Sequence, residues 1–435
     1  MIHRAPWRLI DVHLDRPLEP VAPIGDAHGA TLTFWWRGTP LGQADVTALE
    51  LPLPASQLAS IAGAAIAPAL AHYVAGAPPI AAISEWGRHE WIAPLSYRTL
   101  VVSDPFASLD RLPPPPVAAE VSVVVCTRNR PDDLARCLAS IAALDPAPLE
   151  VIVVDNAPAT GVTRAVVEGA GTVRYVAEPR PGLSAARNAG LRAARGGIVA
   201  FTDDDVTVER DWAGRLAEPF ADPVVGVTTG LVLPAAFDTE AQLLFEHAFG
   251  GFGQGYRPLR FGREFFDRYR TGSAPVWSIG AGASMAVRRD VTERLGGFDE
   301  RLGAGAAGCS EDSELWYRVL AAGLECRYEP RAVVRHHHRS TMAALDGQMY
   351  QYMRGHVTAV LIQYAAHGGR GHLRRVTRTL PAWYARSALR ALGSLARHGR
   401  LRHRHRLLPA QIAGAVAGIF HYLRVRHRAA GGAIA

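Results

Sequence analysis

The sequence predicts an α/β protein built around a parallel sheet, and two observations lead to this class. Continuous apolar runs rich in β-branched residues, VSVVVC (121–126) and LEVIVVDN (149–156), are typical of strands buried on both faces of a sheet. Residues 130–144, between these runs, have helical periodicity, and strand–helix–strand units of this spacing form parallel sheets with right-handed crossovers. A chain of 435 residues has room for two or three domains.

The residues before this pattern predict a small N-terminal α+β module, residues 1–112. ATLTFWW and QADVTALEL have strand composition, and RGTPLG between them carries the Gly and Pro signals of a hairpin turn. An Ala-rich helix follows, with Ser56 as its expected N-cap. Four consecutive prolines, 113–116, favour a stiff extended linker over residues 113–119. The main domain is therefore expected over residues 120–340.

Within the main domain, strands and helices continue to alternate along the sequence. The helix over 130–144 has Pro131 and two acids in its first turn, where the helix dipole favours them. A strand (172–178), a helix (182–195) and a fourth strand (197–202) follow. Ligands of such sheets bind at the carboxyl ends of the strands. This rule selects the polar residues that end three of these strands: 127–129, 155–156 and 203–205.

Three adjacent aspartates, Asp203, Asp204 and Asp205, follow the fourth strand. A solvated turn is the simplest interpretation of such a triplet. Carboxylate oxygens on a turn also suit Mg²⁺ or Mn²⁺, which can bridge a diphosphate. The phosphate loops GxGxxG and GxxxxGK[ST] are absent, and the chain contains no lysine, so a metal would have to handle the phosphates. Alternation along the strand predicts that Asp203 and Asp205 share one ligand, while Asp204 points towards the protein body or an acceptor.

The order of these segments resembles a known family. VVVCTRNRP, VIVVDN, GLSAARNAGL, VAFTDDD, GAGASMAVRR, LGGFDERLGAG, SEDSELWYRV and HHH follow one another over roughly residues 120–340. This ordered set resembles the inverting glycosyltransferases of family 2, which have the GT-A fold. Processive relatives carry a QxxRW motif and several membrane spans, and neither is found in this sequence. The resemblance therefore implies a non-processive enzyme.

The resemblance implies a site for a nucleotide-diphosphate sugar with a divalent cation, Mn²⁺ or Mg²⁺, as cofactor. Asp155 would bind the base, Asp203 would face the ribose and the metal, and Asp205 would bind the cation. The residues assigned to the donor are Thr127, Arg128, Asp155, Arg187, Asp203 and Asp204.

The segment SEDSELWYRVLAAG (310–323) predicts a helix with Ser310 as its N-cap. Glu311 and Asp312 in its first turn are also explained by the helix dipole alone. The resemblance instead implies that Asp312 and its neighbour Glu311 form the catalytic pair. Direct displacement at an anomeric carbon needs a carboxylate that accepts the proton of the acceptor hydroxyl, and Asp312 is the expected base.

Two further segments bear on the site. RHHHRS (335–340) is either a basic surface turn or, as the resemblance implies, a source of a metal ligand; His336 is favoured and His338 is the alternative. WSIGAGASMAVRR (277–289) resembles the acceptor-side turn, where Gly280 and Gly282 would allow close backbone approach. The Gly- and aromatic-rich residues between 234 and 276 are either a mobile flap that stacks on sugars or a hydrophobic loop.

The C-terminal region, residues 341–435, is expected to be helical and basic. Residues 340–435 contain 15 arginines and one acid, Asp346, within a chain of net charge +7. Aliphatic residues three and four apart with arginines between them suit a helix that contacts an anionic membrane, and a lipid-linked acceptor would fit such a location. Packing of this region on the catalytic domain is the alternative. No nucleic-acid-binding module is recognised, so nucleic acid is not an expected partner.

The resemblance implies a glycosyltransferase that acts with inversion in cell-envelope glycan, glycolipid or natural-product glycosylation. The alternatives are a non-catalytic carbohydrate-binding relative, which would lose a carboxylate, and a sugar nucleotidyltransferase, which normally has a Gly-rich, Lys-bearing loop. No apolar signal region and no clean 18-residue apolar stretch are evident. We expect a cytoplasmic location with peripheral contact with the inner face of the cell membrane. The four cysteines lack CxxC spacing and are expected to be free thiols.

Overall fold

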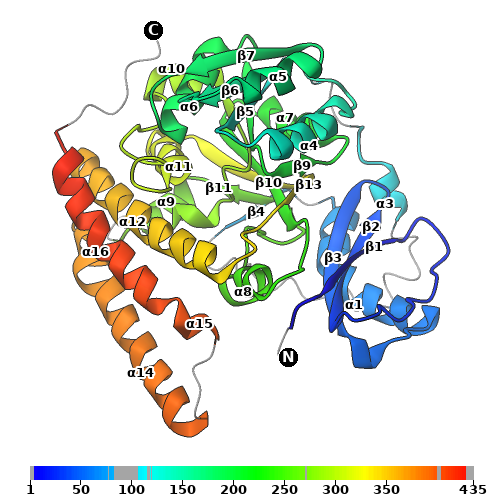
Figure 1. Ribbon diagram of the computed structural model, residues 1–435. Helices are drawn as coiled ribbons and strands as arrows, with labels where there is room; N and C mark the ends of the chain where they lie inside the picture. The colour runs from blue at the N-terminus through cyan, green and yellow to red at the C-terminus, as the bar shows by residue number, and fades with distance from the viewer. Residues whose placement is uncertain are drawn as a thin grey trace.

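The computed structural model describes residues 4–76, 78–82, 106–114, 118, 120–269, 272–398 and 403–427. Part of the predicted linker, residues 115–117 and 119, lies outside the described residues. Figure 1 shows three parts: a small sheet with its helix, a central domain built on a large sheet, and a group of long helices on the opposite side from the small sheet.

The N-terminal part is a three-stranded sheet covered by one long helix. β2 (Gly29–Trp36) and β3 (Thr39–Thr47) form the predicted antiparallel hairpin, and β1 (Arg8–His13) pairs parallel with β2. A short 3₁₀ turn, η1 (Ala48–Glu50), leads to α1 (Ala55–Val74), which packs its Leu58 and Ile66 against the sheet. The expected N-cap was wrong: α1 begins after Pro54, and Ser56 lies inside its first turn.

In the described part of the chain, α1 alone has the length and apolar composition of a membrane span. Length and composition are weak indications by themselves, because the core helix of a water-exposed domain has the same properties. Leu58, Ala62 and Ile66 of α1 are buried in the core of the N-terminal part.

The central domain is a ten-stranded mixed sheet with the order β4-β11-β13-β10-β12-β8-β5-β6-β7, and β9 pairs with β13. Its parallel half was predicted and is confirmed: β5 (Val121–Thr127), β6 (Glu150–Asn156), β7 (Val173–Glu178) and β8 (Ile198–Asp203) pair in parallel. The other strands are β4 (Ile80–Ala81), β9 (Val206–Val208), β10 (Val225–Pro234), β11 (Leu259–Phe261), β12 (Ser284–Arg288) and β13 (Glu325–His336).

Helices cover both faces of this sheet and form two hydrophobic cores. One core includes α6 (Leu183–Ala193), α9 (Arg263–Arg268), α10 (Arg289–Leu295) and α11 (Glu311–Ala321). The opposite core includes α4 (Pro131–Ala142), α5 (Val162–Gly169) and α7 (Trp212–Ala217). The predicted α/β class is therefore confirmed. Further elements complete the domain: η2 (Glu218–Ala221), η3 (Val276–Ser278) and α8 (Glu240–Phe249). The short helix α3 (Ala107–Asp110) instead packs in the core of the N-terminal part through Leu109.

Among its described residues, 234–269 and 272–276, the aromatic segment contributes several rings to the packed core. It forms α8, β11 and α9, and Phe245, Phe261 and Phe265 are almost fully buried. The sequence left two interpretations of this segment, a mobile flap that stacks on sugars and a hydrophobic loop. The burial of these three rings agrees with hydrophobic packing.

The C-terminal region is helical, as predicted. α12 (Met342–His367) is followed by α13 (Arg370–Arg374), a π-helical turn η4 (Arg375–Thr379), α14 (Leu380–His398), α15 (His403–Arg406) and α16 (Leu408–Val425). α12 packs on the central domain through Ala359 and Ile362, which contact Leu302 and Ala307. α16 lies along α12, and Figure 1 shows α12, α14 and α16 side by side.

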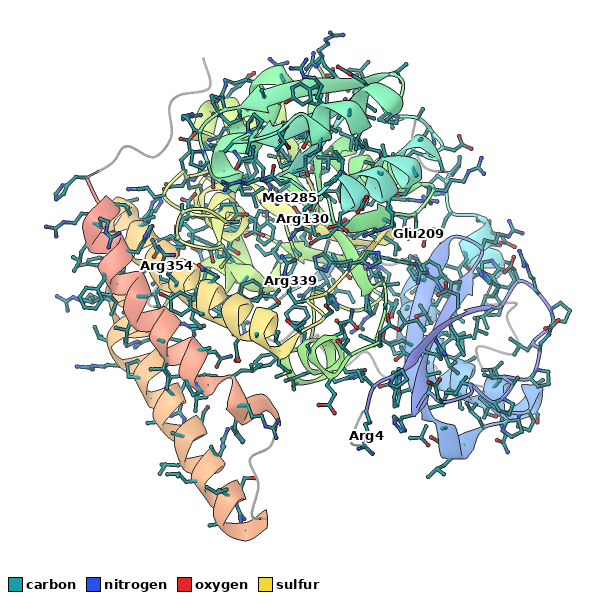
Figure 2. All side chains as sticks on the ribbon, in the orientation of Figure 1. Arg4, Arg130, Glu209, Met285, Arg339 and Arg354 are labelled. Atoms are coloured by element: carbon teal, nitrogen blue, oxygen red, sulfur yellow. The ribbon has the colours of Figure 1, made fainter. Side chains whose placement is uncertain are left out.

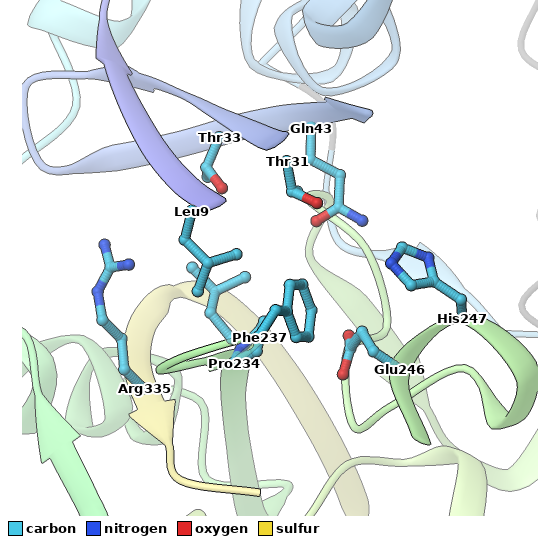
Figure 3. Close-up of a pocket in the computed structure, with 10 residues that line it drawn as sticks. Leu9, Thr31, Thr33, Gln43, Pro234, Phe237, Glu246, His247 and Arg335 are labelled. Atoms are coloured by element: carbon cyan, nitrogen blue, oxygen red, sulfur yellow. The ribbon is translucent and has the colours of Figure 1, made fainter. Parts of the chain in front are cut away.

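The N-terminal part is attached to the central domain by polar and apolar contacts. Trp7 donates its backbone N–H to the carbonyl of Phe237 (2.9 Å), and Arg335 pairs with Asp11 (2.7 Å). The cavity between the two parts is drawn in Figure 3, where Leu9, Thr31 and Thr33 face Phe237 and Glu246. Its volume of about 10 Å³ is roughly the space of one water molecule. This cavity is therefore too small for a ligand larger than water.

Candidate active site

The three polar clusters at the strand ends meet at one edge of the sheet, as predicted. Thr127 at the end of β5 is in register with Asp155 of β6, and Cys126 is in register with Asp203 of β8. β5, β6 and β8 are parallel neighbours, so their carboxyl ends lie at the same edge of the sheet. The parallel strands thus place Thr127, Asp155 and Asp203 along the same edge.

Asp155 presents an acceptor that has no partner in the described part of the chain. Its side chain is 1% exposed, and Oδ2 accepts a hydrogen bond from the Tyr175 hydroxyl (3.0 Å). Oδ1 is buried and has no hydrogen-bond partner among the described residues. A buried carboxylate oxygen without a donor is costly, so this atom is suited to an N–H donor of a bound ligand.

The aspartate triplet follows the strand as predicted, but its backbone differs from the expected alternation, and a ligand shared by Asp203 and Asp205 stays a prediction. β8 ends at Asp203, and Asp204 and Asp205 form a turn, so strand alternation does not extend through the triplet. Asp203 accepts a hydrogen bond from Arg187 (3.1 Å), and burial raises the pKa of this carboxyl group. Asp205 instead contacts Arg130 at 2.9 Å, and Asp203 and Asp205 therefore have different partners.

Asp204 points into the protein body. One carboxylate oxygen accepts from the Thr127 hydroxyl (2.7 Å), and the other accepts from Arg130 (3.0 Å). Burial raises the pKa of Asp204 to about 6, although Arg130 opposes this rise. In this structure Asp204 and Thr127 bind each other at the end of β5, and Arg128, next to Thr127, is exposed. The roles predicted for these three residues in donor binding stay predictions.

Asp205 lies in a cluster of cationic and histidine side chains. Its carboxylate is 3.4 Å from Nε2 of His336 and 3.6 Å from Arg339. Burial disfavours the charged form of Asp205, but His336, Arg130 and Arg339 outweigh burial and lower its pKa. Burial lowers the pKa of His336 to about 4, so near neutral pH the imidazole is uncharged and the two guanidinium groups balance the carboxylate.

The positions of the histidines distinguish the two candidates for a metal ligand. Nδ1 of His336 is 2.9 Å from Nδ1 of His338, so one of these atoms donates a hydrogen bond to the other. Nε2 of His338 is 3.1 Å from a carboxylate oxygen of Glu246 on α8. If His338 donates from Nε2 to Glu246, its Nδ1 accepts from Nδ1 of His336, and Nε2 of His336 then keeps its lone pair towards Asp205. His338 contacts Glu246 and His336 but not Asp205.

The donor set fits a divalent cation. Asp205 Oδ1 and His336 Nε2, 3.4 Å apart, can both reach one ion at bond lengths of about 2.0–2.2 Å. No cluster of three or more His, Cys, Asp or Glu side chains occurs as a metal site within the described residues. The chain therefore offers two donors at this point, and a diphosphate and water would have to supply the others.

Arg187 joins the strand edge to the second acidic cluster. It is 2% exposed, and besides Asp203 it donates to Glu311 (2.7 Å) and to the carbonyl of Gly282 (3.3 Å). Burial disfavours the charge on Arg187, but Glu311 and Asp203 outweigh this effect and raise its pKa. Burial also raises the pKa of Glu311 to about 7, with Arg187 acting against the rise and Asp312 adding to it.

Asp312 differs from Glu311 in two ways. Its side chain is partly exposed, and among the described residues no arginine or histidine lies within hydrogen-bond distance of its carboxylate. Its two oxygens accept backbone N–H groups, from Gly282 (2.9 Å) and from Ser313 (2.6 Å). The predicted N-cap bond of Ser310 is absent: Ser310 precedes α11 with a φ of +72° and its side chain does not cap the helix. This left-handed residue turns the chain so that Glu311 is buried and Asp312 is not.

Gly282 is required by the packing of the site's own side chains. A Cβ at this position would lie 2.9 Å from Arg187 and 3.0 Å from Asp312. A Cβ at Gly280 would lie 2.5 Å from the Thr229 hydroxyl. The close approach predicted for these glycines is therefore found, but towards Arg187, Asp312 and Thr229.

Sequence reasoning did not identify Arg130, Arg339 and Glu246 as part of this site. Arg130 directly precedes helix α4 and Arg339 follows the three histidines, so both stand beside segments that the sequence analysis had selected. Glu246 is 92 residues from His338, and nothing in the local sequence connects them. The four cysteines are free, as predicted.

Comparison with known proteins defines the family. The model of glycosyl transferase family 2 matches residues 122–296. The succinoglycan biosynthesis protein ExoM of Rhizobium meliloti is 31% identical over 264 residues, which is 57% of this chain and 77% of ExoM. The sheet edge and the ordered motifs are those of a glycosyltransferase with a GT-A-type sheet. The chain belongs to glycosyl transferase family 2.

Other relatives are more distant or longer. The pre-mycofactocin glycosyltransferase of Mycobacterium tuberculosis is 30% identical over 249 residues, which is 56% of this chain and 48% of that protein. The chain thus spans about half the length of the first of its curated relatives. Among solved structures, a mannosyltransferase from Pyrobaculum calidifontis in complex with GDP-Man and Mn²⁺ has a TM-score of 0.48 at 20% identity, covering 72% of this chain and 89% of that one.

Proposed function

We propose that this chain transfers a sugar from a nucleotide-diphosphate donor to an acceptor hydroxyl, with inversion at the anomeric carbon. The observation that carries the proposal is the hydrogen-bonded connection between the two acidic clusters. Arg187 donates to Asp203 on the strand edge and to the Gly282 carbonyl, and the Gly282 N–H donates to Asp312. A donor-side carboxylate and an accessible candidate base are thus held in one rigid cluster.

In the proposed reaction the acceptor oxygen attacks the anomeric carbon as the bond from that carbon to the diphosphate oxygen breaks. The hydroxyl proton passes to a carboxylate oxygen of Asp312, which is partly exposed and already fixed by two backbone N–H groups. Arg187 and Glu311 orient the loop that holds Asp312. Asp155 offers its unpartnered oxygen to the nucleotide base, and the diphosphate leaves with the electron pair of the broken bond.

We further propose that a divalent cation, Mn²⁺ or Mg²⁺, is held by Asp205 and His336, with Asp203 nearby on the same edge. When bound, such an ion neutralises the charge of the departing diphosphate. Support comes from the 3.4 Å separation of the two donor atoms and from the neutral state that burial gives to His336. We also propose a cytoplasmic location and a glycan or glycoconjugate hydroxyl as acceptor.

The reaction is tested with a panel of nucleotide-diphosphate sugars. We expect one or a few donors to raise the midpoint of thermal unfolding, and to be hydrolysed slowly to the nucleoside diphosphate, in the presence of Mn²⁺ or Mg²⁺ and less in EDTA. The product anomer, read by NMR with an accepted acceptor, should be inverted. Stabilisation by a nucleoside triphosphate and release of pyrophosphate from a sugar phosphate would instead favour a nucleotidyltransferase. Donor binding with no turnover towards any acceptor or water would favour a non-catalytic relative.

Removing the carboxylate behind the histidine pair is expected to weaken metal binding. In Glu246→Ala, His338 loses its acceptor and no longer fixes the tautomer of His336, so Mn²⁺ affinity should fall about tenfold or more. Glu246→Gln keeps an acceptor oxygen and should retain most of the affinity. Mn²⁺ affinity is measured by calorimetry and by the EPR signal of free Mn²⁺. The matched control is Glu240→Ala, an exposed acid on the same helix; equal affinities of Glu246→Ala and the control would contradict the assignment.

A further inference from the structure

An apolar strip runs along the solvent side of α16. Its large side chains are between 38% and 65% exposed, and no Arg, Asp or Glu occurs between Leu407 and Leu423. The spacing of three and four residues keeps these side chains on one face of the helix. The strip, named here the α16 strip, consists of Ile412, Val416, Ile419, Phe420 and Leu423.

The opposite face of α16 is fixed against α12, so the α16 strip cannot turn inward. A Cβ on Gly414 would lie 2.1 Å from the carbonyl oxygen of Tyr350, and one on Gly418 would lie 2.6 Å from that of Arg354. The Thr358 hydroxyl of α12 also donates to the carbonyl of Gly418 (3.1 Å). Only glycine permits this backbone-to-backbone contact, and the two glycines four residues apart set which face of α16 is outward.

The neighbouring helix α14 has a second apolar surface. Leu389 is 68% exposed and Leu392 is 62% exposed, while Tyr384 and Ala391 are turned inward and buried. Of the fourteen large apolar side chains that are exposed in the described residues, nine lie on α14 and α16. Single exposed apolar residues are normal on any protein, but this concentration on two adjacent helices marks an interaction surface.

The charge around the strip identifies the partner. Arg386, Arg390 and Arg397 are exposed on α14, and Arg424 and Arg426 are exposed at the end of α16. Asp346 is the one acid in residues 340–435. A second copy of the chain would bring equally basic helices together, whereas an anionic lipid surface complements arginines beside an apolar strip. We propose that α14 and α16 form a docking surface for an anionic lipid bilayer, with α16 lying in its interface.

The geometry links this surface to the candidate active site. α12, the helix on which α16 is fixed, begins at Met342, three residues after Arg339, which is 3.6 Å from Asp205. Docking through α16 would therefore hold α12 alongside the bilayer, from Arg354 at the α16 contact back to the start of the helix near Arg339; Figure 2 labels both arginines. Given the proposed function, on which this step rests, such an arrangement suits an acceptor hydroxyl carried by a lipid. The docking itself does not depend on the reaction.

The surface is tested by flotation of the full chain with vesicles, which needs no sugar transfer. We expect binding to phosphatidylcholine vesicles that contain about 30% phosphatidylglycerol, and a loss of binding in about 0.5 M NaCl. Phe420→Glu/Leu423→Glu should lower the partition coefficient at least about tenfold, because two large side chains no longer enter the interface. The matched control, Leu49→Glu/Leu149→Glu, changes two exposed leucines outside these helices and should bind like the parent chain.

The charged part is tested separately with Arg386→Gln/Arg390→Gln, which should weaken binding to anionic vesicles and reduce its dependence on salt. Unchanged midpoints of thermal unfolding show that each variant is folded. Equal binding of the Phe420→Glu/Leu423→Glu variant and its control would overturn the proposal, as would equal binding to vesicles of phosphatidylcholine alone. A dimer in light scattering that this variant abolishes would show that a second copy covers the strip. Failure of vesicle binding would leave the proposed reaction untouched, because donor hydrolysis is measured without lipid.

Discussion

Asp312→Asn is expected to lower kcat about 10³-fold while leaving the donor affinity unchanged, because a positioned general base contributes about 10²–10⁴-fold to such a reaction. The substitution keeps the size of the side chain and one acceptor oxygen for the N–H of Gly282 or Ser313. The amide cannot accept the proton of the acceptor hydroxyl. The measurement is steady-state transfer with the donor found in the nucleotide-sugar panel, together with the Kd of that donor from calorimetry.

Two comparisons isolate the effect. Asp290→Asn, on an exposed acid in the first turn of α10, should leave kcat unchanged. Glu311→Gln should lower kcat less than Asp312→Asn, because the Glu311 carboxylate is buried against Arg187 and does not face solvent. If Asp312→Asn keeps more than about a tenth of the activity, or loses donor binding to the same extent, Asp312 is not the base.

The parallel half of the sheet could be predicted from the sequence because its strands are buried on both faces. Val123, Val124 and Val125 are fully buried, and this environment selects continuous β-branched runs that are easily recognised. The convergence of Thr127, Asp155 and Asp203 followed from topology alone, since parallel strands end at one edge. Local pattern and global fold agree in this part of the chain.

The partners of the site residues could not be predicted in the same way. Arg187 and Glu311 are 124 residues apart, and Arg130 and Asp205 are 75 residues apart. Their pairing depends on how helices pack over the sheet, which hydrophobic periodicity does not specify. The local conformation at Ser310 also differs from the prediction, because a left-handed N-cap residue has no side-chain signature when it is a serine. The exposed face of α16 required the structure, since Gly414 and Gly418 decide which side is covered.

Arg187→Met is expected to lower the free energy of unfolding by about 3–5 kcal/mol at pH 8, because it leaves the buried carboxylate of Glu311 without its cation. The side chains of Arg187 and Glu311 are 3% and 6% exposed, so water cannot replace the lost partner. Arg289→Met is the matched control: it removes an ion pair with Glu293 whose side chains are 40% and 46% exposed, and should cost about 0–1 kcal/mol. Urea unfolding followed by circular dichroism measures both.

The cost of Arg187→Met should also depend on pH in a defined direction. Burial raises the folded-state pKa of Glu311 from its ordinary 4.5 to about 7, so Glu311 is largely protonated at pH 6 and ionised at pH 8. The folded protein holds a proton that the unfolded chain releases between these two pKa values, and the contribution of this group to stability falls as the pH rises through that window. Arg187 lowers the pKa of Glu311, so the removal of Arg187 raises this pKa further. The pH range between the unfolded-state and folded-state pKa values of Glu311 then becomes wider.

Arg187→Met should therefore cost less at pH 6, where Glu311 is neutral, than at pH 8, where it is charged. Asp203 and Asp312 also face Arg187, and their contribution should remain when Glu311 is replaced. In a Glu311→Gln background the cost of Arg187→Met should be smaller at pH 8 and should depend less on pH, with the remaining dependence due to Asp203, whose pKa burial also raises. If Arg187→Met lowers the free energy of unfolding equally at pH 6 and pH 8 in the parent chain, the prediction is wrong. Glu311 would then already be ionised at pH 6, with a pKa below 6 in the folded protein.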